Sequence, residues 1–240
     1  QRSGTTLVYM LLSSHKHVEG KNEDETLFDF QLPIELYRNW RKTKWTCYKL
    51  PTQTYNLNYI KDHYPKAKIL WTVRNPYAVI SSMRSLIINP GGKNWLQTDH
   101  CGPSELIRHA ELFPEILSLK ISELDEITLG AYIWKFKILL ADHYKKTGMH
   151  IQTIVYEKLL NDPETILKTA LNRIGLPWDK NLLAHEQFHK EKKYIGNTMG
   201  SNPIMKSKLI QTYNLKKHDY MIINSICHNE MRRYGYRERA

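Results

Sequence analysis

The sequence predicts an α/β fold of three layers, in which a central parallel sheet is flanked by helices. Apolar runs rich in β-branched residues, notably 67–73 and 150–156, alternate with longer segments of helical periodicity. This alternation is typical of a parallel sheet covered on its faces by helices. The chain has 240 residues, 41% of them hydrophobic, which suffices for a sizeable core. Because no repeat, low-complexity tract or linker interrupts it, we expect one domain over 1–240.

Local signals place each element in turn. A first helix is expected over 5–14, where Ser3 or Thr5 can accept a hydrogen bond from its first amides. The strands are expected at 45–49, 67–73 and 150–156, and the further helices at 53–64, 76–85, 104–120, 123–146, 162–175 and 217–233. The Asn-Pro-Gly-Gly run at 89–92 is the strongest loop signal in the chain, so we interpret 87–127 as a variable insertion.

The net charge and the cysteines limit the class of protein. Lys and Arg number 35 against 24 Asp and Glu, a formal charge of +11, which suits an anionic partner such as a nucleotide, a nucleic acid, an acidic polymer or a membrane surface. The three cysteines, Cys47, Cys101 and Cys227, form no CxxC pair, so neither a disulfide framework nor a cysteine zinc site is indicated. No apolar run approaches membrane-spanning length. We therefore expect a cytoplasmic protein, unless a signal or anchor precedes residue 1.

The eleven histidines do not indicate a metal site. His15 and His17 are two apart, and His185 and His189 are four apart near an uncertain helix end, with no third ligand in either case. No bound metal is expected.

The first residues have the composition of an anion-binding loop. Arg2, Ser3, Gly4, Thr5 and Thr6 place a cation, a glycine and hydroxyls where a strand should turn into a helix, so we expect a first strand upstream of residue 1. Backbone amides at a helix N-terminus and its dipole favour an anion there. The alternative is a plain hydroxyl-capped helix. A Walker A loop is excluded because its GxxxxGK[ST] pattern is absent, which argues against a P-loop kinase.

A second cation and hydroxyl follow the strand expected at 67–73. Arg74 stands at the end of this strand, and Ser82 lies eight residues later on the next helix. This spacing lets both side chains converge on one anion. The alternative for Arg74 is an ordinary capping or surface cation.

Together these segments resemble the sulfotransferases that use 3′-phosphoadenosine 5′-phosphosulfate, most closely the tyrosylprotein and bacterial-type branch. The resemblance implies a P-loop-like fold and covers nearly the whole chain except 87–127. The loop of Arg2 to Thr6 resembles the family's 5′-phosphosulfate loop. Arg74 with Ser82 resembles its 3′-phosphate site, and Tyr156 in Tyr-Glu-Lys-Leu resembles a nucleotide contact. The ending Arg-Arg-Tyr-Gly-Tyr at 232–236 is also similar to that branch.

The resemblance implies transfer of a sulfuryl group to a hydroxyl by in-line displacement, without a metal. Arg2 and Lys49 would stabilise the charge that develops on the bridging oxygen. Where the small-molecule branch has a histidine base, this chain has Pro51, and the acidic run at 23–25 resembles the glutamate base of the other branch instead. Counting from Arg2 indicates Glu23, whereas matching the Glu-Thr dipeptide indicates Glu25, so both remain candidates.

The late loop and the insertion complete the expected site. Gly196 and Asn197 resemble a Gly-Asn pair of bacterial members and would cover the nucleotide, although a plain surface loop is an alternative. The insertion 87–127 is expected near the acceptor, with Trp95 as a stacking residue.

The sequence leaves the class of acceptor open between carbohydrate, lipid, peptide tyrosine and small hydroxyl compounds. It also leaves the oligomeric state open. The other hypotheses are a catalytically degenerate relative and a basic nucleotide- or nucleic-acid-binding protein. The scattered charge argues against a nucleic acid partner.

Overall fold

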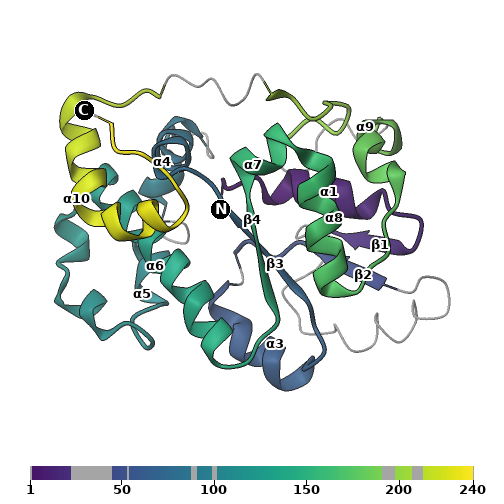
Figure 1. The fold of residues 1–240 in the computed structure, drawn as a ribbon. Coiled ribbons are helices and arrows are strands. Elements are labelled where there is room, and N and C mark those ends of the chain that lie inside the picture. The colour runs from purple at the N-terminus through teal and green to yellow at the C-terminus, as the bar shows by residue number, and fades with distance from the viewer. Residues whose placement is uncertain are drawn as a thin grey trace. The chain divides into compact units, whose positions relative to one another are not determined.

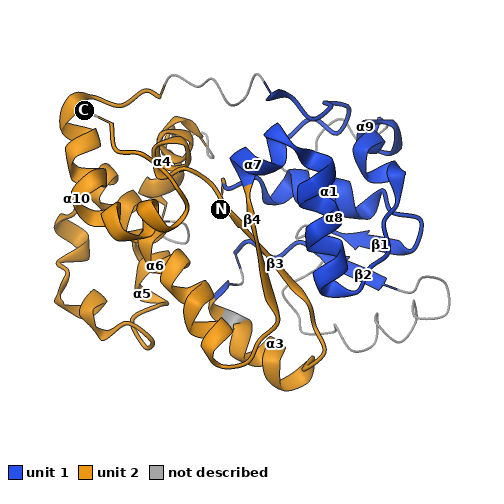
Figure 2. Cartoon of the chain, in the orientation of Figure 1, with its two compact units in different colours: residues 1, 3–54, 156–209 blue, residues 2, 55–155, 210–240 orange. Residues whose placement is uncertain are grey.

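The computed structural model describes residues 2–22, 45–52, 54–87, 91–98, 102–190, 198–206 and 213–239. The chain divides into two compact units, coloured separately in Figure 2. Unit 1 comprises residues 1, 3–54 and 156–209, and unit 2 comprises residues 2, 55–155 and 210–240.

Unit 1 contains a pair of parallel strands against which a helix packs. Its elements are α1 (Thr5–Ser13), β1 (Val18–Lys21), β2 (Trp45–Tyr48), α7 (Tyr156–Asn161), α8 (Pro163–Ile174), the 3-10 segment η5 (Lys180–Ala184) and α9 (His185–Phe188) (Figure 1). β1 and β2 run parallel, with Val18 opposite Trp45 and Lys21 opposite Tyr48. Helix α1 contacts both strands, η5 and α9. Its side chains from Val8 to Leu12 are all buried, so α1 lies at the centre of this unit.

Unit 2 contains a second parallel pair and the longest helix. Its elements are α3 (Leu57–His63), β3 (Ile69–Val73), α4 (Pro76–Ser85), η2 (Trp95–Gln97), α5 (Pro103–Ile107), η3 (Pro114–Ser118), η4 (Ile121–Glu123), α6 (Glu126–Lys146), β4 (Ile151–Val155) and α10 (Lys217–Arg233). The 3-10 turn η1 (Thr54–Asn56) lies where the chain passes from unit 1 to unit 2. β3 and β4 pair from Ile69 opposite Ile151 to Val73 opposite Val155.

The core of unit 2 is organised by α6. Helices α4, α5 and α10 all pack against it (Figure 1). Trp134, Leu140 and Tyr144 of α6 are almost completely buried, and burial of each such side chain contributes about 1.5–3 kcal/mol. Among the described residues, no helix has the length and apolar character needed to cross a membrane.

The predicted α/β class with parallel strands is confirmed. The bounds of α4 and α10 are close to those expected, and for α4 the reason is local: the Asn75 side chain accepts a hydrogen bond from the Tyr77 amide, and Pro76 occupies the first turn. The helix expected over 162–175 also forms, as α8, which Gly175 terminates in the left-handed conformation.

Two expectations are wrong, and two elements were missed. The helix expected over 104–120 is divided, because Pro114 lacks the amide that a continuing helix needs, so that α5 and the 3-10 segment η3 form instead. Strand β1 and helix α7 were not expected. The N-cap of α1 is Gly4, with no side-chain hydrogen bond, rather than Ser3 or Thr5.

Candidate active site

Three predicted site residues meet in unit 2. The Arg2 Nε donates a hydrogen bond of 3.0 Å to the Ser82 Oγ, and the Arg74 Nη1 donates one of 3.2 Å to the Arg2 carbonyl oxygen. Burial, and next the charge of Arg74, lower the pKa of Arg2. An anion bound beside the two guanidinium groups would favour the charged form of Arg2. Arg2 thus links Arg74 and Ser82, the two residues that the sequence predicts to converge on one anion.

The connection between β3 and α4 places Arg74 and Ser82. Arg74 directly follows the last residue of β3, and its carbonyl oxygen accepts a hydrogen bond of 2.9 Å from the Trp134 indole. Asn75 and Pro76 then start α4, which carries Ser82 two turns later. The indole of Trp134 thus holds the backbone at Arg74. Its role in fixing Arg74 could not be inferred, because 60 residues separate the two in sequence.

The loop of Ser3 to Thr6 lies in unit 1 and starts α1. Gly4 adopts a φ of 88°, and the ring of Tyr156 lies so close that a Cβ on Gly4 would be 2.2 Å from the Tyr156 Cδ2. Thr5 and Thr6 form the first turn of α1. Since no side chain caps this N-terminus, its amides and the positive end of the helix dipole suit an anion.

Tyr156 and Lys49 also lie in unit 1. Tyr156 starts α7 directly after β4, and it is 7% exposed with its ring against Gly4. Lys49 follows β2, where its amide donates to the Lys21 carbonyl oxygen at 3.0 Å, and it is 6% exposed. Lys49 is thus one of the few buried charged side chains among the described residues.

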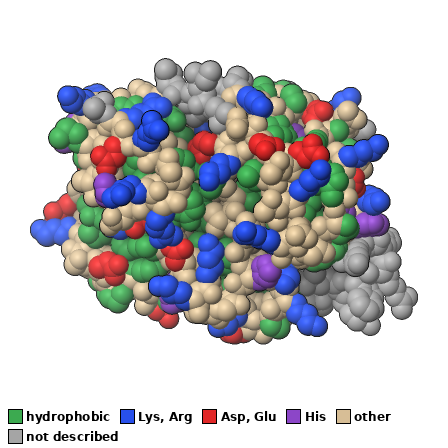
Figure 3. Space-filling view, in the orientation of Figure 1, with side chains coloured by type: hydrophobic (Ala, Val, Ile, Leu, Met, Phe, Trp, Pro, Cys, Tyr) green, Lys and Arg blue, Asp and Glu red, His purple; other side chains and the backbone are tan. Residues whose placement is uncertain are grey.

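Four predicted site residues lie outside the described residues: Glu23, Glu25, Gly196 and Asn197. Trp95 is described, and it starts η2 within the insertion and packs partly against the core. Among the described residues, no group of three or more His, Cys, Asp and Glu side chains could hold a metal ion. On the face drawn in Figure 3, Lys and Arg side chains are scattered among acidic and hydrophobic ones rather than gathered in one patch.

Comparison with known families identifies the chain. Residues 24–180, more than half of the sequence, match the profile described as the sulfotransferase family, and this range includes Lys49, Arg74, Ser82 and Tyr156. The chain belongs to the sulfotransferase family. It is accordingly a transferase, as the resemblance of its motifs implied. No curated protein sequence matches this sulfotransferase significantly.

Two solved structures are similar to this sulfotransferase. A sulfotransferase domain from the curacin biosynthetic pathway matches with a TM-score of 0.59 and 14% identity, covering 99% of this chain and 95% of that one. The sulfotransferase domain of the olefin synthase from Synechococcus PCC 7002 matches with a TM-score of 0.56 and 15% identity, covering 93% and 90%. At these identities the comparison concerns the fold, and it confirms the predicted P-loop-like α/β fold.

Proposed function

We propose that this sulfotransferase takes its sulfuryl group from 3′-phosphoadenosine 5′-phosphosulfate and transfers it to a hydroxyl. The observation that carries the proposal is the cluster of Arg2, Arg74 and Ser82 in unit 2. Two guanidinium groups and a hydroxyl match the charge and the hydrogen-bonding capacity of a terminal phosphate, the group that distinguishes this donor from adenosine 5′-phosphosulfate.

The other site residues suit the other end of the donor. The uncapped amides of α1, with Ser3, Gly4, Thr5 and Thr6, would bind the 5′-phosphosulfate, and Tyr156, Gly196 and Asn197 would contact the nucleotide. In the reaction, an oxygen–sulfur bond to the acceptor forms while the bond from sulfur to the 5′-phosphate oxygen breaks. Lys49 would stabilise the charge on that leaving oxygen, and Glu23 or Glu25 would take the acceptor's proton. Arg2 was expected to share the role of Lys49, but its side chain is hydrogen-bonded to Ser82, so we assign it to the 3′-phosphate instead. The products are a sulfate ester and 3′-phosphoadenosine 5′-phosphate.

The acceptor of this reaction is a hydroxyl compound whose class stays open. The similar structures come from an olefin synthase and a biosynthetic pathway, which supports including small biosynthetic alcohols in a first screen beside phenols, sugars, lipids and tyrosine peptides. A degenerate relative would bind the donor nucleotide and turn over none of these.

Replacing Arg74 tests the phosphate assignment. Arg74→Ala should weaken binding of 3′-phosphoadenosine 5′-phosphate by tenfold or more, about the effect of losing one charged hydrogen bond, and leave adenosine 5′-phosphate almost unchanged. Calorimetric titration of both nucleotides measures this, with the exposed Arg232→Ala as a control of equal charge change. Equal losses for the two nucleotides would remove Arg74 from this role.

Replacing each candidate base tests the proton transfer. One of Glu23→Gln and Glu25→Gln should bind 3′-phosphoadenosine 5′-phosphate normally while turnover falls by about 10²–10⁴-fold, because only the acceptor's proton depends on that carboxylate. The other variant serves as its matched control. Full activity of both variants would exclude a carboxylate base at these positions.

A further inference from the structure

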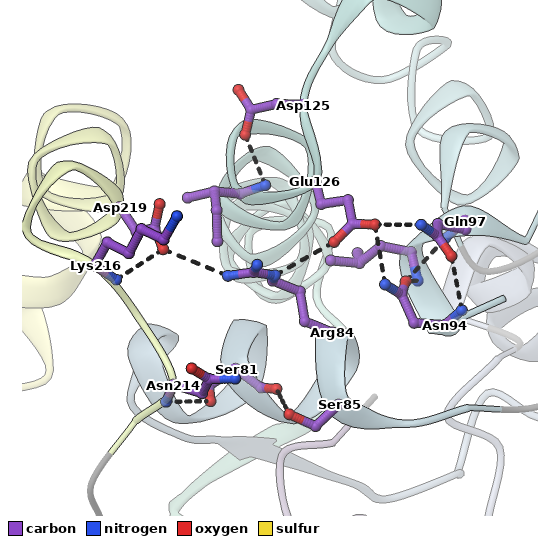
Figure 4. Close-up of polar contacts among 12 residues, drawn as sticks. Ser81, Arg84, Ser85, Asn94, Gln97, Asp125, Glu126, Asn214, Lys216 and Asp219 are labelled. Carbon is purple, nitrogen blue, oxygen red and sulfur yellow. Dashed lines mark hydrogen bonds and ion pairs between the residues drawn. The ribbon is translucent and has the colours of Figure 1, made fainter. Parts of the chain in front are cut away.

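A hydrogen-bonded network surrounds Arg84 on the helix that carries Ser82 (Figure 4). The Arg84 Nε lies 3.3 Å from Glu126 Oε2, and its Nη1 lies 3.4 Å from Asp219 Oδ2. The second oxygen of Glu126 accepts hydrogen bonds from Asn94 Nδ2 at 3.0 Å and from Gln97 Nε2 at 2.6 Å. One guanidinium thus joins α4 to α6 and α10, and one carboxylate extends the connection to η2.

The partners of Arg84 are themselves fixed at the starts of their elements. The Asp219 carboxylate accepts a hydrogen bond of 2.9 Å from the Lys216 amide at the start of α10. Glu126 is the first residue of α6, after the cap Asp125. The Asn94 side chain accepts hydrogen bonds from the first amides of η2. Carboxylates in the first turn of a helix are favoured by its dipole, so Arg84 is attached to rigid supports.

Close packing supports the same arrangement. One turn after Glu126, Gly130 of α6 faces Ile80 of α4 and Leu96 of η2, and a Cβ at Gly130 would lie 3.2 Å from Ile80 and 3.4 Å from Leu96. Helices α4, α6 and the η2 turn therefore fit together with no spare space at this point. A change in the direction of α4 is opposed by both the packing and the network.

Ser82 and Arg84 lie on opposite faces of α4. Two residues along a helix correspond to a rotation of about 200°. Ser82 contacts Arg2, whereas Arg84 contacts two carboxylates, so the charge of Arg84 is already balanced and is not directed to a phosphate. Arg84 therefore makes no direct contact with an anion bound beside Ser82, and the position of the helix links the two sites.

We propose that Arg84 is a positioning residue of the donor site, which holds α4 so that Ser82 can contact the 3′-phosphate. This role rests on the proposed function. Three observations support it: Arg84 forms two ion pairs, the carboxylates of these pairs belong to α6 and α10, and Ser82 lies on the same helix as Arg84.

The test compares 3′-phosphoadenosine 5′-phosphate with adenosine 5′-phosphate in calorimetric titrations. Arg84→Met should weaken the first by about tenfold, the effect of losing one well-placed hydrogen bond to a charged group, and leave the second within about twofold. The affinity of Arg84→Lys for 3′-phosphoadenosine 5′-phosphate should lie between those of the wild type and Arg84→Met, because a lysine cannot form both ion pairs with the geometry of a guanidinium. In a Ser82→Ala background, Arg84→Met should cause no further loss. The matched control is Arg233→Met, which breaks a 2.5 Å ion pair between α10 and α6 and leaves the network intact.

Glu126→Met separates positioning from long-range electrostatics by the sign of its effect. It removes a negative charge, which would strengthen binding of an anion if electrostatics alone mattered. Positioning predicts the opposite, a weaker binding that again concerns only the nucleotide with the 3′-phosphate. If Arg84→Met lacks a cooperative thermal transition and is therefore not folded, Glu126→Met is compared with the wild type in its place.

The outcomes distinguish the two proposals. A wild-type protein that does not prefer the 3′-phosphorylated nucleotide would overturn the proposed function, and the role of Arg84 with it. A wild-type preference that Arg84→Met retains in full, equal losses for both nucleotides, or tighter binding by Glu126→Met would overturn the positioning role alone.

Discussion

At the scale of single residues, Gly4 and Tyr156 determine the shape of the candidate phosphate loop. Gly4 has a φ of 88°, and the Tyr156 ring occupies the space where any other residue would place its Cβ. Only glycine satisfies both conditions without strain. Tyr156, predicted as a nucleotide contact, thereby also fixes the backbone in front of α1, a contact between segments far apart in sequence that no local pattern reveals.

Gly4→Ala should be more harmful than an alanine at another left-handed glycine. At Gly175, where φ is 79° and an alanine methyl would meet nothing within 4 Å, only the backbone strain of about 1 kcal/mol should reduce the free energy of unfolding. Gly4→Ala adds a collision with Tyr156, an additional cost of about 1–3 kcal/mol. Chemical denaturation of both variants measures the difference. Equal losses would show that the Tyr156 ring yields without cost.

At the scale of elements, a buried ion pair attaches α5 to α6. The Glu105 Oε1 lies 2.6 Å from the Lys137 Nζ, and Glu105 is fully buried. Burial alone would raise the pKa of Glu105, but the Lys137 ammonium, followed by the neighbouring His109, lowers it to about 2. The pair attaches the middle of the insertion, at α5, to the helix that organises unit 2.

The depressed pKa of Glu105 gives stability a defined pH dependence. The ordinary pKa of a glutamate is 4.5. The lowered pKa therefore adds about 3 kcal/mol to the free energy of unfolding above pH 4.5, and this contribution is lost as the pH falls toward 2. Glu105→Gln leaves the Lys137 charge buried and should cost about 3–5 kcal/mol at neutral pH. Denaturation at a series of pH values should show this deficit shrinking in acid. The exposed Glu164→Gln, whose partner is Lys168, should change stability by less than about 1 kcal/mol. A deficit that is independent of pH would refute the assignment.

The elements that the sequence predicts well are those with local signals. Asn75 and Pro76 mark the start of α4, and Gly175 marks the end of α8. β1 was missed because Val-Glu-Gly-Lys has no strand pattern, and its formation depends on pairing with β2. In the insertion, helical periodicity over 104–120 misled, because it was given more weight than Pro114, at which the 3-10 segment η3 begins.

In the candidate site, too, local features are predicted from the sequence, and contacts between distant segments are not. The convergence of Arg74 with Ser82 is predicted from their spacing along one strand and one helix, and in the structure each of them is hydrogen-bonded to Arg2. The Trp134 hydrogen bond to Arg74 and the network around Arg84 join segments far apart in sequence, which periodicity cannot detect.

At the scale of the whole molecule, the family and the fold are the strongest conclusions. The family match covers residues 24–180, and the similar structures extend over nearly the whole chain. The excess of basic residues, +11 in formal charge, suits a donor with several negative charges. The fold does not determine which donor binds. The identity of the donor must therefore be measured, because every residue role proposed above depends on it.

Calorimetric titration with 3′-phosphoadenosine 5′-phosphate measures recognition of the 3′-phosphate, with adenosine 5′-phosphate and ATP as controls. We predict micromolar binding that requires the 3′-phosphate, because Arg2, Arg74 and Ser82 would recognise that group. A thermal melt of the same sample establishes that it is folded. Absence of binding by the folded protein, or equal affinity for the nucleotide without the 3′-phosphate, would contradict the account.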